Sequence, residues 1–215
     1  KIAKIEGLYH GSYDFAEVSL RNKPGDRNGS APISTAYSYG TPDSVLTEVV
    51  ALPFNEIEAT ESLINLHGER LACIMIDLMP QTLSMVSPSE DYLKALFRLT
   101  RKHGILLAFD EVISFRLGYS GGQGMFGIDP DITSIGKIIG GGFPVGAVAG
   151  RKDIMSVFEP QGGQSPRLPH GGTFNANPIT MTAGKAALQA MDEDKFDRLN
   201  AAGNQLRQQV TEIIA

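Results

Sequence analysis

The stretch "SPSEDYLKALFRLTRKHGILLAFDEV", residues 87–112, places a helix directly before a strand and so decides the fold. Its first part predicts a helix over 87–104, with Ser87 as N-cap, Pro88 at the first helical position and Glu90 completing a capping box. Gly104 is expected to end this helix. Side chains at helical spacing form the expected inner face, which comprises Tyr92, Leu93, Leu96, Phe97 and Thr100. The remaining "ILLAFDEV" is typical of a buried strand.

A second apolar run precedes the helix. "LACIMIDLM", residues 71–79, also predicts a buried strand. The order strand, helix, strand implies a parallel pair joined by a right-handed crossover. A further helix is expected to begin after Asn177 as its cap, with Pro178 at the first helical position. These segments together predict an α/β fold with a mostly parallel central sheet flanked by helices.

The two ends of the chain differ from the middle. "KIAKIEG", residues 1–7, reads as a strand already in progress, and the segment 192–215 has a helical pattern that reaches Ala215 without a stop signal. We therefore expect a piece of a longer protein. The side chains expected on one face of the last helix are Phe196, Leu199, Leu206, Val210 and Ile213. The polar, turn-rich region 14–40 is expected to be a long surface loop.

Composition and charge exclude several classes of protein. The formal net charge is −5 and the pI is about 5.4, which argues against binding to nucleic acid or to an anionic membrane. Cys73 is the single cysteine, lies in an apolar run and is expected to be a buried, inert thiol. A disulfide within the chain is impossible, which favours a cytoplasmic location. The first residues do not resemble a signal peptide, and apolar runs stay far below membrane-spanning length.

Asp110 is the first candidate functional residue. It closes the predicted strand 105–112, and in parallel sheets ligands gather at the carboxyl ends of strands. A carboxylate at a buried strand end needs a partner, so a helix cap or a structural ion pair is the competing interpretation. Glu111 is expected to point to the opposite face, which argues against a paired acid–base dyad.

Two glycine patterns do not support a nucleotide site. Gly122, Gly124 and Gly127 match G-x-G-x-x-G, but the sequence predicts neither a buried strand before them nor a helix after them. A phosphate-binding P-loop around residues 131–138 would need Gly and Ser or Thr where Asp131 and Ile138 stand. The histidines also lack the spacing of metal ligands, so a metal site is not expected.

Lys137 is the second candidate, within "SIGKIIGGGFPVG", residues 134–146. Its stem could simply cover apolar surface. However, Ile135, Ile138 and Ile139 are expected to bury the amine and favour its neutral form, which attacks aldehydes. The glycines 140–142 are expected to let the backbone pass close to a bulky ligand. An amine, a strand-end carboxylate and close backbone approach suggest a Schiff base with an aromatic aldehyde.

Four segments resemble a known family. "GLYHG" (7–11), "LLAFDEVISFRLG" (106–118), "DITSIGKIIGGGFPVGAVAGRKDIM" (131–155) and "HGGTFNANPITMTAG" (170–184) resemble class III aminotransferases that depend on pyridoxal 5'-phosphate (PLP). The nearest branch is that of glutamate-1-semialdehyde 2,1-aminomutase, including relatives that act on β-amino acids. The resemblance implies a PLP-dependent transferase type I fold. Residues 1–191 would form the central part of its large domain, and 192–215 a helix leading toward a C-terminal small domain.

The resemblance implies a role for each matching residue. Lys137 would form the Schiff base and move the proton between substrate and cofactor. Asp110 would pair with the protonated pyridine nitrogen of PLP. Val112 would pack against one face of the ring, and Tyr9 would stack on the other with His10 beside it.

The segment before the helix at 178 carries a further implication. Gly172 and Thr173 resemble residues that reach the cofactor phosphate of the neighbouring subunit, so the resemblance implies a homodimer with shared active sites. The implied substrates are amino acids or amino-aldehydes. An aminotransferase for β-amino acids, a catalytically inactive binding subunit and a nicotinamide-dependent oxidoreductase are the alternatives.

One segment departs from the family pattern. Asp77 and Leu78 stand where the family usually has Glu-Pro, followed by a polar residue near the phenolic oxygen of PLP. In "DLMPQTL" either Gln81 or Thr82 would have to make that contact, and the sequence leaves both open.

Overall fold

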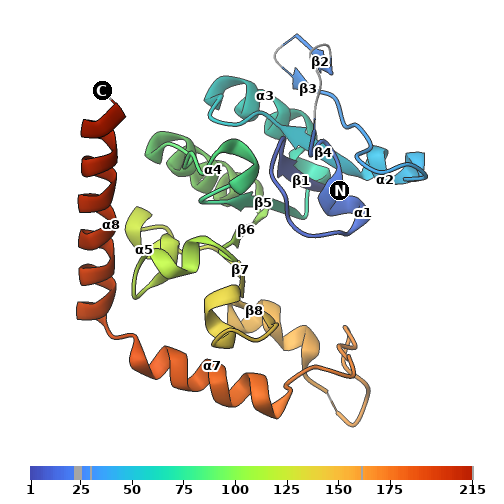
Figure 1. The fold of residues 1–215 in the computed structure, drawn as a ribbon. Coiled ribbons are helices and arrows are strands. Elements are labelled where there is room, and N and C mark those ends of the chain that lie inside the picture. The colour runs from blue at the N-terminus through green and yellow to red at the C-terminus, as the bar shows by residue number, and fades with distance from the viewer. Residues whose placement is uncertain (22–25, 30, 161, 215) are drawn as a thin grey trace.

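The computed structural model describes residues 1–21, 26–29, 31–160 and 162–214. A six-stranded sheet, in the order β4-β1-β5-β6-β7-β8, runs through the molecule (Figure 1). The first five strands in this order are parallel, and β8 pairs with β7 in antiparallel fashion. The strands are β1 Ile2–Ile5, β2 Arg27–Asn28, β3 Ala31–Pro32, β4 Val49–Leu52, β5 Cys73–Asp77, β6 Leu106–Asp110, β7 Ile132–Gly136 and β8 Gly146–Gly150. The strands β2 and β3 form a separate antiparallel pair.

Helices connect and flank the strands. The α-helices are α1 Asp14–Glu17, α2 Asp43–Glu48, α3 Ile57–His67, α4 Glu90–His103, α5 Gly121–Phe126, α6 Lys152–Met155, α7 Pro178–Ala190 and α8 Glu193–Ile214. Short 3₁₀ turns are η1 Gly68–Arg70, η2 Gln81–Leu83, η3 Ser114–Leu117, η4 Lys137–Gly140 and η5 Ser156–Phe158. Within the described ranges, no helix is long and apolar enough to cross a membrane. The predicted α/β architecture is confirmed.

Helix α4 and strand β6 occupy the stretch that decides the fold. Gly104 ends the helix as expected, with a backbone φ of +65° that suits glycine. The predicted N-cap is wrong, because Ser89 rather than Ser87 accepts the hydrogen bond from the Tyr92 N–H. Asn55 Oδ1 accepts the Ser89 N–H, and this tertiary contact places the helix start two residues later than the sequence suggests.

The main core lies between the sheet and the helices that follow its strands. Tyr92 is fully buried, and its hydroxyl donates to the Pro53 carbonyl at 2.7 Å. The predicted inner face of α4 is confirmed, except that Phe97 is only half-buried. The principal core side chains of strands and helix are Ala3, Ile5, Ile74, Ile76, Leu93, Leu96, Leu99, Leu107 and Phe109.

The region 14–40 is only partly the surface loop that the sequence predicts. It contains α1 and the β2–β3 pair, and Val18 packs with Val45 and Val49 in a small apolar cluster. Residues 22–25 and 30 of this region lie outside the described residues, as does Ala215 at the expected end of the last helix. The many turn-forming residues of this segment predicted a loop, although a few of its apolar side chains pack against the rest of the fold.

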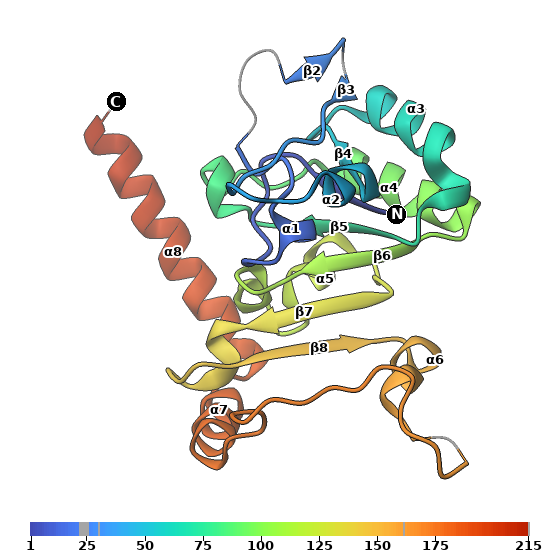
Figure 2. The ribbon, with the colours of Figure 1, turned by 90° about the vertical axis from the view of Figure 1, so that its right-hand side faces the viewer.

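The last two helices lie away from the main core. Figure 2 shows α7 beyond β8 and α8 as a long rod that extends past the sheet. Asn177 caps α7 as predicted, since its side chain accepts the Ile179 and Thr180 N–H groups. In α8 only Phe196 is buried, against Tyr119, whereas the other apolar side chains of the predicted face are exposed. The proposed division at residues 191 and 192 stays a prediction.

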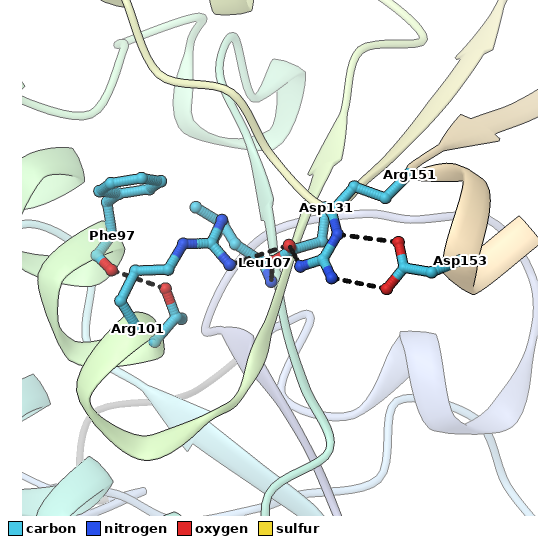
Figure 3. Close-up of polar contacts among 7 residues, drawn as sticks. Phe97, Arg101, Leu107, Asp131, Arg151 and Asp153 are labelled. Carbon is cyan, nitrogen blue, oxygen red and sulfur yellow. Dashed lines mark hydrogen bonds and ion pairs between the residues drawn. The ribbon is translucent and has the colours of Figure 1, made fainter.

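The buried carboxylate of Asp131, directly before β7, joins three elements of the fold (Figure 3). Asp131, just before β7, is fully buried and accepts hydrogen bonds from Arg101 of α4, from Arg151 after β8 and from the Leu107 N–H, each at 2.8 Å. Burial raises the pKa of Asp131, but these hydrogen bonds outweigh burial and hold it below its usual range. The cluster ties α4, β6 and β8 together.

Candidate active site

A cavity of about 860 Å³ opens at the carboxyl edge of the sheet. Asp77, Asp110 and Ser134 line it from neighbouring strands, and the pairing register places them in one row. The loop after β1 adds Tyr9 and His10. Carboxyl ends of parallel strands are where α/β proteins bind ligands, so this cavity is the candidate active site.

Asp110 carries three hydrogen bonds in this cavity. His10 Nδ1 lies 2.8 Å from Oδ2, while the Val112 N–H and the Ser134 hydroxyl donate to Oδ1 at 3.1 and 3.2 Å. Burial raises the pKa of Asp110, but the hydrogen bonds from His10, Val112 and Ser134 lower it below its ordinary value. Asp110 is therefore a carboxylate at neutral pH.

His10 is the partner that orients Asp110. Its side chain is buried, and burial lowers the pKa of His10 against the opposing effect of Asp110. A neutral imidazole that donates from Nδ1 to the carboxylate fits this environment. Its Nε2 atom is buried without a hydrogen-bond partner in the described part of the chain. The sequence placed His10 only beside Tyr9, and its contact with Asp110, 100 positions away, could not be foreseen.

Lys137 lines the same cavity at the start of η4. The expectation that Ile135, Ile138 and Ile139 bury its amine is wrong, because the Lys137 side chain is exposed. Its backbone φ of +49° lies in the left-handed region, which costs a residue with a side chain about 1–2 kcal/mol. Strain of this kind is found at functional sites, where the surrounding structure enforces it.

One of the glycines after Lys137, Gly141, is needed for packing against α7. A Cβ atom on Gly141 would collide with the Ala183 carbonyl of α7, and one on Gly184 would collide with the Ile139 carbonyl. Helix α7 therefore packs backbone to backbone against the turn that carries Lys137. The close approach of this backbone to a ligand stays a prediction.

The remaining predicted residues of the cavity differ in their surroundings. Tyr9 and Val112 both line it, and Tyr9 is 48% exposed. Gln81 and Thr82 also line it, but the Thr82 hydroxyl donates to the Gly7 carbonyl. The Gln81 amide, by contrast, has no partner among the residues that the structure describes.

Gly172 and Thr173 lie outside this cavity. Both are exposed in the segment before α7, where the Gly172 carbonyl accepts the Asn175 N–H at 3.0 Å. The structure therefore does not bring them together with Lys137 and Asp110. Asp77 and Ser134 are cavity residues that sequence-based prediction missed, although the position of Asp77 at a strand end is the same signal that identified Asp110.

Glu111 confirms the expected opposite orientation. Its carboxylate accepts the N–H groups of Gly122 and Gln123 and the hydroxyl of Ser114. Residues within the G-x-G-x-x-G pattern form the short helix α5, and the strand β7 rather than a helix follows the pattern, as the sequence predicts. The start of this helix holds Glu111, which occupies the N–H groups that an anion would need.

Cys73 is consistent with an inert thiol. Burial raises the pKa of Cys73 to about 11, so the thiolate is not populated at neutral pH.

Comparisons with known proteins give the same architecture. A glutamate-1-semialdehyde 2,1-aminomutase of Methanocella arvoryzae is 38% identical, over 100% of this chain and 48% of that protein. The crystal structure of an omega-transaminase from Sphaerobacter thermophilus superimposes with a TM-score of 0.96 at 51% identity. The match covers 100% of this chain and 49% of the omega-transaminase chain. A transaminase with PLP bound has a TM-score of 0.87 at 40% identity, and the match covers 97% of this chain and 47% of the transaminase chain.

The chain spans about half the length of the curated relatives it matches. These relatives and structures also support the predicted fold class, a mostly parallel sheet flanked by helices as in transaminases. The profile of the family described as aminotransferase class-III matches residues 1–215, from the first strand to the last helix. The chain therefore belongs to the class III aminotransferase family.

Proposed function

We propose that this chain carries the catalytic centre of a PLP-dependent enzyme that transfers amino groups. One observation carries the proposal: the exposed amine of Lys137 and the carboxylate of Asp110 line a single cavity at the carboxyl edge of the sheet. His10 holds Asp110 in the ionised form. A structural ion pair or helix cap, the competing interpretation of Asp110, would not need an open cavity beside it.

The residues of the cavity fit PLP. An anionic Asp110 suits a protonated pyridine nitrogen, and the exposed Lys137 amine suits covalent attachment of an aldehyde. Val112 and the exposed ring of Tyr9 supply apolar surface for an aromatic ring. When bound, PLP supplies an electron sink for the carbon that carries the amino group.

The side chains of this chain would then perform three tasks. Lys137 Nζ takes the proton from the substrate carbon that bears the nitrogen and returns it during the second half of the reaction. Asp110 holds the pyridine nitrogen protonated, and the Nδ1–H of His10 keeps the carboxylate oriented. Gln81 is the donor for the phenolic oxygen, because Thr82 already gives its proton to the Gly7 carbonyl.

The substrates are proposed to be amino acids or amino-aldehydes. Both a transaminase and an aminomutase of the glutamate-1-semialdehyde type fit the cavity. The 51% identity to an omega-transaminase, against 38% to an aminomutase, favours a transaminase. A cytoplasmic location also belongs to the proposal, because a single cysteine suits a reducing compartment.

A panel of amino donors tests this function on the full-length, PLP-loaded protein. α-amino acids, β-amino acids, simple amines and glutamate-1-semialdehyde are each supplied with and without a keto acid. A transaminase turns over only with the keto acid, whereas an aminomutase needs none. A protein that binds PLP but converts no donor would support the inactive binding subunit instead.

We also propose a homodimer in which each active site is shared. Gly172 and Thr173 lie outside the cavity of their own chain and are exposed, as residues that serve a neighbouring subunit would be. A phosphate held in trans by the Thr173 hydroxyl and the backbone around Gly172 would make the dimer the active unit.

Replacing Thr173 with alanine should weaken PLP binding in this dimer. Loss of one hydrogen bond to a charged group costs roughly 1.5–3 kcal/mol, or about one to two decades in the dissociation constant. Fluorescence titration with PLP measures this change. Thr182→Ala is the matched control, since its hydroxyl donates within α7 to the Pro178 carbonyl.

Mixed dimers show whether Thr173 acts in trans. Lys137→Ala and Thr173→Ala chains are combined, so that a shared site collects both lesions and leaves the other site intact. Activity at limiting PLP should then exceed that of either parent. Hybrid dimers that form without this rescue would place Thr173 in its own subunit or outside the site.

A further inference from the structure

Asp77 is a second carboxyl group in the cavity, and the proposed function gives it no task. It ends β5 directly beside Asp110 of β6 in the pairing register. Asp77 lines the cavity, yet its residue is only 5% exposed. Two carboxyl groups on adjacent strand ends would repel each other if both were ionised, so their environments must differ.

The hydrogen bonds of the two groups separate their roles. Asp110 receives three, including one from an imidazole. Asp77 receives one, from the Met79 N–H to Oδ1 at 2.7 Å. Its Oδ2 atom has no partner among the described residues and remains as the oxygen that can interact with the cavity.

The surroundings of Asp77 favour its neutral form. Burial is the largest effect, and the negative charges of Asp110 and Glu111 act in the same direction. The Met79 hydrogen bond and the positive charge of Lys137 oppose them, and the net result raises the pKa of Asp77 to about 7. The amine of Lys4 on the adjacent strand β1 donates to the Leu8 and Val18 carbonyls and makes no hydrogen bond to Asp77.

We propose that Asp77 is a ligand-binding residue that, while protonated, donates a hydrogen bond from Oδ2 to the anionic cofactor in the cavity. When Asp77 loses this proton, the donor becomes a second carboxylate beside Asp110, and the cavity repels an anion. Asp77 would therefore set the upper pH limit for cofactor binding. This inference rests on the proposed function, because it takes PLP as the ligand.

Asp77→Asn isolates this role. The amide keeps an oxygen to accept the Met79 N–H and an N–H to donate to the cavity, but it cannot ionise. Dissociation constants for PLP are measured by fluorescence with wild-type and variant full-length apoprotein from pH ~6 to ~9. Pyridoxine 5'-phosphate, which lacks the aldehyde, is the second probe, because its binding does not involve the amine of Lys137.

The ratio of wild-type to variant dissociation constants cancels the titration of the cofactor and of the other residues. The ratio should be level below neutral pH and rise by up to about tenfold per pH unit above it, because only protonated Asp77 binds. Asp77→Ser, which also cannot ionise, should match Asp77→Asn in its pH profile. Asp77→Glu should restore a pH-dependent ratio relative to these variants.

The outcomes separate this inference from the proposed function. A ratio that stays constant over the whole pH range, with tight PLP binding throughout, would show that Asp77 is structural and leave the proposed function intact. If Asp77→Asn fails to fold, the same comparison with Asp77→Ser decides. Wild-type protein that binds neither probe would overturn the proposed function and this inference together.

Discussion

Replacing Lys137 with alanine should reduce amino-group transfer by at least ~10²–10⁴-fold, the usual contribution of a positioned proton-transfer group. The variant loses the only amine among the described residues that line the cavity. It loses both the covalent attachment of PLP and the base that moves the proton at the substrate carbon. The fold should be retained, because the Lys137 side chain is exposed.

Two measurements on the full-length protein check this result. Turnover is compared for wild type, Lys137→Ala and the control Lys152→Ala, which removes another exposed lysine from α6, outside the cavity. Borohydride should fix PLP covalently to Lys137 in wild type, as peptide mass spectrometry can locate, and should fail to do so in Lys137→Ala. Near-native turnover of Lys137→Ala would remove the basis of the assignment.

Replacing Asp131 with alanine should destabilise the fold by about 3 kcal/mol. The substitution leaves the buried Leu107 N–H without its acceptor and breaks the ion pairs with Arg101 and Arg151. Both arginines reach solvent and can be hydrated again, so the loss should stay at the lower end of the range for buried ion pairs. Urea unfolding followed by circular dichroism measures the change in free energy.

Asp153 provides the matched control for Asp131. It binds the same Arg151 but is exposed, so Asp153→Ala should change the free energy of unfolding little. The contribution of Asp131 also depends on pH. Because the pKa of Asp131 is held below its ordinary value, its stabilisation is present at neutral pH and lost as the pH falls through the lowered pKa. Equal urea midpoints for wild type and Asp131→Ala would contradict this role.

Local patterns predicted the elements around the site with good accuracy. The predicted strand 105–112 corresponds to β6 Leu106–Asp110, and Asn177 caps α7, because these features depend on neighbours within a few residues. The N-cap of α4 was misplaced because it depends on Asn55, 34 positions before Ser89. This prediction failed because a distant side chain competed with the local signal.

In the candidate active site, too, the sequence predicted local features but not contacts between distant residues. The sequence alone determined the α/β class and the strand end at Asp110, and through the resemblance it predicted a role for Lys137. Only the tertiary structure decided that His10 is the partner of Asp110, that Asp77 lies beside it, and that Gly141 packs against α7. Strand order, register and packing bring together residues distant in sequence, and hydrophobic periodicity carries no information about which strands become neighbours.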